Sequence, residues 1–384
     1  MNDQDNKTTP DQSQSQSEPV GEQPTQPAPK APVDPVAAAE KPAPKPAPKP
    51  KPKPKPDPNS KLYKPDHQPF VLTSSPHFSS VDSVPHIMWM VVVALVPTTL
   101  LAVYFFRMAA VNMILACIAG AVVTEMICNR MKGEGFTVKD GSAVITGLLL
   151  ALTLPPSLPL TSGILGSVFA IGIGKQIFGG LGYNIFNPAL LGRAFLGASF
   201  PVPMTTWTFP ATAKYAALDG VTAATPLGLF KFEERLTEYP EMLLGNIGGS
   251  LGETSALAVL LGGIFLLVKR YADWRIPVSY LGTVFVLGGI FWLISPDKYP
   301  DPVFQLLSGG LMLGAFFMAT DMVTSPITPL GSWIFGIGAG LLLIIIRLFG
   351  GLPEGVMYSI LLMNAITPLL NRYTRPKFFG EVTA

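Results

Sequence analysis

Ten hydrophobic runs occupy the chain from residue 87 onward, and they constrain its fold more than any other feature. They fall at 87–106, 109–128, 143–154, 162–178, 185–200, 255–268, 276–294, 303–319, 333–349 and 355–370. A straight helical span of a bilayer needs about 20 apolar residues, and backbone in lipid must satisfy its own hydrogen bonds. The runs therefore predict an all-α integral membrane protein with about ten transmembrane helices.

The composition agrees with a membrane location. Charged residues make up 14% of the chain, whereas soluble domains average about 25%. The net charge of +2 gives no indication of a nucleic-acid partner. The sequence begins MNDQDNKTTP without an apolar segment, so we expect no cleaved signal peptide and an uncleaved first span.

Two of the runs are short and end at prolines, which predicts broken or half helices. The third ends in Thr153-Leu154-Pro155-Pro156, and the eighth ends near Thr324-Ser325-Pro326. The dipeptide Pro159-Leu160 recurs 170 residues later, and Phe178-Gly179-Gly180 recurs 171 residues later. Each half holds five runs, and an odd number of spans reverses the second copy. The pattern predicts two inverted five-helix repeats, whose interface favours binding sites.

Basic residues in the short loops predict the orientation. They follow the second, sixth and tenth runs, at Arg130, Lys132, Lys139, Lys269, Arg270, Arg275, Arg372, Arg375 and Lys377. Positive charge is retained on the cytoplasmic side, so both termini should be cytoplasmic. We expect an N-terminal arm at 1–60, a first membrane repeat at 61–200, an extracytoplasmic loop at 201–252, and a second repeat with the C-terminus at 253–384.

The arm at 1–60 ends in KPAPKPAPKPKPKPKPDP. Alternating Lys and Pro removes backbone donors and repels itself, which predicts a disordered, extended segment. It is either a solvated spacer or a contact for anionic lipid or a partner, since each Lys near a negative leaflet gains up to about 1 kcal/mol.

The extracytoplasmic loop contains the segment DGVTAATPL at 219–227. By itself this is a turn of small residues, in which Asp-Gly favours the turn and a threonine caps a helix. A threonine alcohol is a poor nucleophile, so attaching any group to it needs an enzyme and small neighbours that permit close approach.

The segment GGLGYNIFNPAL at 179–190 resembles the signature of the RnfD and NqrB family, and SPHFSSVDSVPHIMW at 75–89 is similar as well. The resemblance covers about residues 70–375. In that family a flavin transferase joins the phosphate of FMN to the last threonine of a small-residue motif. The resemblance implies Thr225 as the acceptor, with Asp219, Thr222, Ala223 and Ala224 as its motif, although the family often has glycine at the position of Ala223.

What the resemblance implies is a flavin-carrying subunit of an Rnf-type complex in the bacterial inner membrane. Such a complex couples electron transfer between ferredoxin and NAD to Na⁺ or H⁺ translocation. The implied partners are the C, G, A, E and B type subunits, the flavin transferase and membrane lipid. A second, noncovalent flavin such as riboflavin is also implied. The alternatives are the NqrB component of the Na⁺-translocating NADH:quinone reductase and a cofactor-free secondary transporter.

The sequence does not support an iron–sulfur cluster or a haem as the redox centre. Two cysteines cannot ligate a four-thiolate cluster, and none of the three histidines lies in a predicted span, which excludes a bis-histidine haem there. The stretch GIGKQ at 172–176 lacks the spacing of a phosphate-binding loop, and its glycines indicate close helix packing. Flavin, by contrast, would supply redox chemistry that side chains lack.

Charged residues near the spans are candidates for function because burying them in a membrane costs several kcal/mol. Glu125 and Asp321 are candidates for an ion pathway, or else they snorkel to the interface. Lys175 and Arg193 flank the Asn187-Pro188 step and would hold either flavin or a helix C-terminus. We include Asn187 and Arg193 among the predicted flavin contacts.

Overall fold

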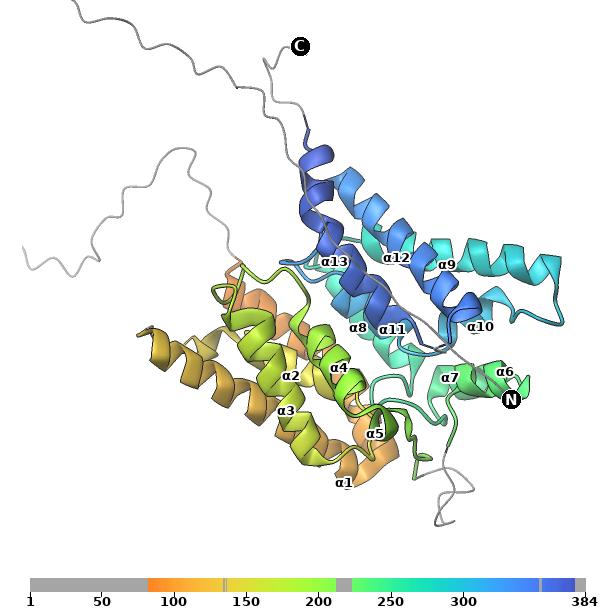
Figure 1. Ribbon diagram of the computed structural model, residues 1–384, viewed down its shortest axis with the longest axis horizontal. Coiled ribbons are helices and arrows are strands. Elements are labelled where there is room, and N and C mark those ends of the chain that lie inside the picture. Colours follow the sequence, from red (N-terminus) through yellow and green to blue (C-terminus); the bar gives the residue numbers. More distant parts are fainter. Residues whose placement is uncertain (1–81, 134, 136, 212–222, 352–353, 377–384) are drawn as a thin grey trace, which may run out of the picture. The chain divides into compact units, whose positions relative to one another are not determined.

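The fold is described from a computed structural model of the chain (Figure 1). It describes residues 82–133, 135, 137–211, 223–351 and 354–376. The predicted arm at 1–60 and the motif residues Asp219 and Thr222 lie outside the described residues. Within these ranges the chain is helical, without a strand, and a single isolated bridge pairs Trp207 with Ala223.

Helices occupy all ten hydrophobic runs. The first five runs correspond to α1 (Val84–Lys132), α2 (Ser142–Leu152), α3 (Leu160–Ile171) with η2 (Gly172–Gln176), and α4 (Pro188–Ser199). The last five correspond to α8 (Ala256–Val268), α9 (Arg275–Ile294), α10 (Pro302–Leu307) with α11 (Leu311–Leu313) and η3 (Gly314–Met318), α12 (Pro329–Phe349) and α13 (Val356–Tyr373). Between them lie η1 (Val138–Asp140), α5 (Pro201–Thr205), α6 (Pro226–Glu233) and α7 (Tyr239–Leu244).

Three of these helices, α1, α9 and α12, are long and apolar enough to cross a bilayer, while α2 and α8 are shorter apolar helices. Helix α1 has 49 residues, more than one straight span needs. It joins the first two predicted runs, and its helical geometry breaks at Arg107, where φ is 54° and ψ is −134°. These helices identify the chain as an integral membrane protein.

The helices pack closely through glycine. Helix α1 contacts α2, α3 and α8, and α12 contacts α9 and α13. A Cβ on Gly147 of α2 would lie 2.7 Å from Cα of Ile118, and one on Gly262 of α8 would overlap the carbonyl oxygen of Ala94. Hydrophobic exclusion does not drive helices together inside lipid, so such close backbone approach is a main source of attraction.

Helix breaks are present in the third and eighth runs, although the eighth is interrupted upstream of the predicted position near Pro326. Helix α2 has 11 residues, and the eighth run is interrupted at Ser308–Gly310 between α10 and α11. The C-terminal carbonyls of α2 are satisfied by a distant segment, because Gly252 N donates to Leu152 O at 2.6 Å and Leu251 N to Leu154 O at 3.1 Å. The segment before α8 is therefore tied to the broken end of α2.

Two π-helical turns, η2 and η3, follow α3 and α11. Each inserts an extra residue into the helical repeat, and such turns occur frequently at functional sites. The turn η2 contains the GIGKQ stretch and presents Lys175 to the interior, where only 2% of its side chain is exposed.

Candidate functional site

Thr225 is the N-cap of α6. Its backbone is extended, with φ −69° and ψ 154°, and its Oγ1 accepts a hydrogen bond from Gly228 N at 3.1 Å. Pro226 follows at the first helical position, where its missing N–H costs nothing. On the other side, Ala223 N donates to Trp207 O at 3.0 Å. These contacts fix the described end of the predicted motif, and Thr225 itself is buried.

Helix α6 is held by an apolar cluster and by one lysine. Leu227 and Phe230 pack with Phe304 of α10 in a cluster that also contains Met242 and Ile247. Lys231 Nζ donates to Arg347 O at 3.2 Å and to Gly350 O at 2.5 Å, at the C-terminal end of α12. A cation is favourable there because it faces the negative end of the helix dipole. Partial burial lowers the pKa of the Lys231 ammonium.

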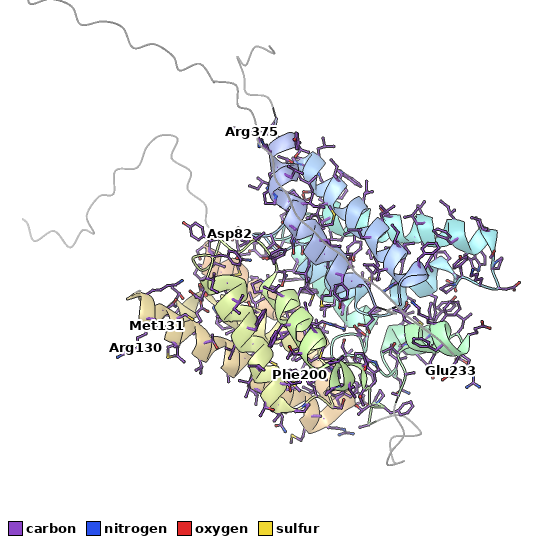
Figure 2. All side chains as sticks on the ribbon, viewed as in Figure 1. Asp82, Arg130, Met131, Phe200, Glu233 and Arg375 are labelled. Atoms are coloured by element: carbon purple, nitrogen blue, oxygen red, sulfur yellow. The ribbon has the colours of Figure 1, made fainter. Side chains whose placement is uncertain are left out.

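A cavity of about 550 Å³, here named the Thr225 cavity, opens beside this motif. Thr225, Ala223 and Ala224 line it together with three aromatic side chains, Trp207, Phe232 and Tyr358. Glu233, at the end of α6 and labelled in Figure 2, also lines it. Its volume lies in the range of cavities that bind drug-sized ligands and cofactors, about 300–1,000 Å³.

The polar wall of the Thr225 cavity is a charged group of three side chains. Arg193 Nη2 lies 2.5 Å from Glu354 Oε2, and Arg193 Nη1 lies 3.9 Å from Glu253 Oε1. The three residues come from α4, the segment before α8 and the segment before α13. The structure thus places Arg193 at the cavity, as the sequence suggested. Glu354 was not predicted, because it lies outside the apolar runs and only tertiary packing brings it here.

Asn187 lies elsewhere. Its Oδ1 caps α4 by accepting from Ala189 N at 3.0 Å, and its Nδ2 donates to Met318 O at 3.2 Å. Asn364 Oδ1 accepts from Asn187 N at 3.3 Å. Asn187 lines a different cavity, of about 80 Å³, which does not include Thr225. Its contacts are those of a residue that joins α4 to η3 and α13.

Glu125 and Lys175 form a buried ion pair. Lys175 Nζ lies 2.8 Å from Glu125 Oε1, and the two side chains are 2% and 1% exposed. Ser142 Oγ lies 2.6 Å from the same Nζ, and Thr137 Oγ1 donates to Glu125 Oε1 at 3.1 Å. A snorkelling glutamate would keep its carboxylate in water. Glu125 is instead neutralised inside the protein by the lysine of η2.

Asp321 follows η3 and is half-buried. It accepts a hydrogen bond from Thr324 Oγ1 at 3.0 Å. Asp321 and Lys175 both line the 80 Å³ cavity that contains Asn187. The two predicted ion-pathway carboxylates are therefore related through Lys175, which pairs with one of them and shares a cavity with the other.

Comparison with known proteins places the chain in a family. The model of the NQR2, RnfD, RnfE family matches residues 71–380. The D-type subunit of the proton-translocating ferredoxin:NAD(+) oxidoreductase complex of Clostridium ljungdahlii is 47% identical over 321 residues, covering 81% of this chain and 96% of the relative.

Two further relatives agree. The D-type subunit of the Na(+)-translocating ferredoxin:NAD(+) oxidoreductase complex of Acetobacterium woodii is 46% identical, covering 80% of this chain and 95% of the relative. The D-type subunit of the ion-translocating oxidoreductase complex of Escherichia coli is 38% identical, covering 81% of this chain and 99% of the relative. The resemblance noted in the sequence is confirmed: the chain belongs to the NQR2, RnfD, RnfE family.

Proposed function

We propose that this chain is the flavin-carrying membrane subunit of an Rnf-type complex. The complex would couple electron transfer between ferredoxin and NAD to Na⁺ or H⁺ translocation, with FMN joined through its phosphate to Thr225. The names of the relatives support the complex. The observation that carries the flavin is the position of Thr225 on the wall of a 550 Å³ cavity lined by aromatic side chains.

The residues present fit FMN. Trp207, Phe232 and Tyr358 offer apolar surface for a planar ring, and Ala223 and Ala224 leave room beside the acceptor. A Cβ on Gly228 would lie 3.2 Å from Thr225 Oγ1, so glycine at that position keeps the approach to the hydroxyl open. The N-terminus of α6 would favour the negative phosphate through its dipole.

When bound, FMN would supply reversible electron transfer that the protein's own side chains cannot perform. Thr225 would tether it at the start of α6, and Lys231 would hold α6 on the end of α12. The aromatic side chains would exclude water from the ring. A flavin transferase must carry out the attachment, because an unassisted threonine hydroxyl is a weak nucleophile.

The test of this proposal is the intact mass of the purified subunit, together with in-gel fluorescence after denaturation. We expect a mass increase equal to FMN less one water, and flavin fluorescence that survives denaturation. A cofactor-free secondary transporter would show neither. Identifying the subunits that copurify would separate an Rnf-type complex from the NADH:quinone reductase alternative.

We also retain the inverted repeat of five spans per half. The order of elements supports it, because a short or interrupted element, α2 or α10 with α11 and η3, occupies the third place of each half. A π-helical turn also occurs in each half. The orientation with both termini cytoplasmic in the bacterial inner membrane, and with the α6 loop outside, follows from the basic short loops.

A cysteine-labelling experiment tests this orientation. Arg235→Cys is a suitable outer probe because 78% of the Arg235 side chain is exposed, whereas Lys231 is engaged with α12. We expect an impermeant maleimide added outside intact cells to label Arg235→Cys and to leave Arg372→Cys unlabelled. Permeabilised cells should label both. The opposite pattern in intact cells would reverse the proposed orientation.

For the ion pathway we propose Asp321 and Glu125. Asp321 is the sharper test, because the hydrogen bonds to its carboxylate come from neutral groups, the Thr324 hydroxyl and the backbone at Val323, whereas Glu125 is paired with a lysine. We expect Asp321→Asn to lower the number of ions moved per electron in proteoliposomes while electron transfer continues. Thr324→Val removes the hydroxyl and keeps the charge, so it should retain the ratio. An unchanged ratio in Asp321→Asn would exclude this carboxylate from coupling.

The remaining proposals concern partners. The C, G, A, E and B type subunits and a flavin transferase are proposed on the basis of family membership. A second, noncovalent flavin such as riboflavin is proposed on the same basis. Denaturing the purified subunit and extracting free flavin would test this second site. If the only flavin found is FMN attached to Thr225, the second flavin is excluded.

A further inference from the structure

Glu253 is a buried carboxylate on the wall of the Thr225 cavity. Its side chain is 3% exposed, and its Oε1 lacks a hydrogen-bond partner. Its backbone lies next to Gly252, whose N–H is bonded to the broken end of α2. Burying an ionised carboxylate without full pairing is costly, so the surroundings of Glu253 raise its affinity for a proton.

The nearest cation does not neutralise Glu253 fully. Arg193 places Nη2 2.5 Å from Glu354 Oε2, while its Nη1 remains 3.9 Å from Glu253 Oε1. That second distance is too long for a hydrogen bond. Arg193 therefore pairs closely with Glu354, and its positive charge acts on Glu253 only from a longer distance.

The other titratable groups around Glu253 do not bring a positive charge close to its carboxylate. Arg347 faces the same region from α12, but its guanidinium donates to Gln305 O at 2.6 Å and to Ser308 O at 2.9 Å, at the end of α10. Glu233 on α6 and Tyr358 on α13 line the cavity and bring no positive charge.

The Glu253 carboxylate is also confined. A Cβ on Gly310 would lie 2.9 Å from Glu253 Oε1, and a Cβ on Gly249 would lie 3.3 Å from Glu253 Oε2. The carboxylate thus lies close to the backbone at two glycines. Because the side chain is only 3% exposed, water screens it little, and a negative charge added in the cavity would raise its affinity for a proton.

We propose that Glu253 is a redox-linked proton acceptor of the Thr225 cavity. This inference rests on the proposed function, because it requires that electrons reach a flavin in the cavity from a reduced carrier of a partner subunit. The added negative charge raises the proton affinity of Glu253. One proton then moves from hydronium to a carboxylate oxygen of Glu253, forming one O–H bond and releasing water, and no electron passes to the side chain.

Glu253 is the acceptor and Glu354 is not, for a reason visible in the contacts. Glu354 has a close guanidinium partner at 2.5 Å and a side chain that is 21% exposed, whereas Glu253 is 3% exposed and 3.9 Å from the same guanidinium. Each carboxylate keeps a buried Oε1 without a hydrogen-bond partner, and Arg193 is a positioning residue in this scheme because its guanidinium lies close to Glu354 and farther from Glu253.

The experiment compares the purified complex with Glu253→Gln, using Glu241→Gln on the exposed face of α7 as the matched control. The midpoint potential of the covalent flavin is titrated against dithionite across pH 6 to 9. In Glu253→Gln we expect the reduction equilibrium constant to rise about tenfold at alkaline pH, which is about 59 mV for one electron. The difference should vanish at acidic pH, where Glu253 of the wild-type protein is already protonated. Glu241→Gln should follow the wild type.

Redox-difference infrared spectroscopy provides the second measurement. Reduction of the wild-type complex should produce a carbonyl band of a protonated carboxylic acid, which Glu253→Gln lacks and Glu241→Gln keeps. Two results would overturn the proposed proton acceptor while leaving the proposed function intact. One is a wild-type complex that carries flavin but shows no such band. The other is a Glu253→Gln complex whose flavin has the same potential and pH dependence as the wild type. If Glu253→Gln fails to assemble, a shift of the band in Glu253→Asp supports the assignment, and an unshifted band overturns it. Absence of covalent flavin from the wild-type subunit would instead contradict the proposed function.

Discussion

Thr225→Ala is expected to abolish covalent flavin completely. The alanine removes the hydroxyl oxygen at the N-cap of α6 that would carry the phosphoester. The variant also loses the N-cap that Thr225 Oγ1 provides to Gly228 N, at a cost of about 1 kcal/mol. This is too small to unfold the membrane core. Intact mass and in-gel fluorescence would show the loss.

Two variants control for this result. Thr225→Ser keeps a hydroxyl and a cap, so it should retain part of the flavin. Thr206→Ala removes a nearby hydroxyl that bonds only to the carbonyl of Val202 among the described contacts, and it should retain all of the flavin. Undiminished fluorescence from Thr225→Ala would show that another residue carries the cofactor.

The second large effect concerns the ion pair of Glu125 and Lys175. Replacing one partner leaves the other charge buried without a counter-charge, at a cost of about 3–5 kcal/mol. We therefore expect Glu125→Gln and Lys175→Met each to lower the denaturation temperature markedly in detergent. The double variant removes both charges and should recover most of the loss, because no buried charge remains.

An exposed pair provides the comparison. Arg235 and Glu233 lie 3.7 Å apart, with side chains 78% and 51% exposed. Water screens such a pair, so Glu233→Gln should change the stability by less than about 1 kcal/mol. If the double variant at positions 125 and 175 is no more stable than the single ones, the two side chains are not paired in the membrane. A confirmed pair would mean that a pumping defect in Glu125→Gln must be separated from lost stability.

The sequence predicted the helices well because apolar runs are long, uninterrupted signals. It also predicted the break after the third run, which Pro155 and Pro156 mark, but not the interruption of the eighth run at 308–310, which lies upstream of Pro326. It did not predict the π-helical turns η2 and η3, because an apolar run has the same composition whether its helical repeat contains an extra residue or not. The break at Arg107 within α1 falls in the gap between the first two predicted runs.

The sequence predicted some residues of the candidate site and missed others. Thr225 and Arg193 were identified, and the structure brings both to one cavity. Asn187 was grouped with them, but it lines another cavity, because neighbours in sequence on α4 face different sides of the helix. The pairing of Arg193 with Glu354 spans 161 residues and depends on how α13 packs, which no local pattern reports.

The N-cap bond of Thr225 has a consequence for how the protein would mature. The hydroxyl that would receive the phosphate belongs to a residue that is only 3% exposed, and it is already hydrogen-bonded to Gly228 N. Another enzyme would have to reach it through the Thr225 cavity or before α6 packs against α10 and the end of α12. The Phe230 and Lys231 contacts hold α6 in place, so in the folded protein the cavity would be the route by which a transferase presents the flavin to Thr225.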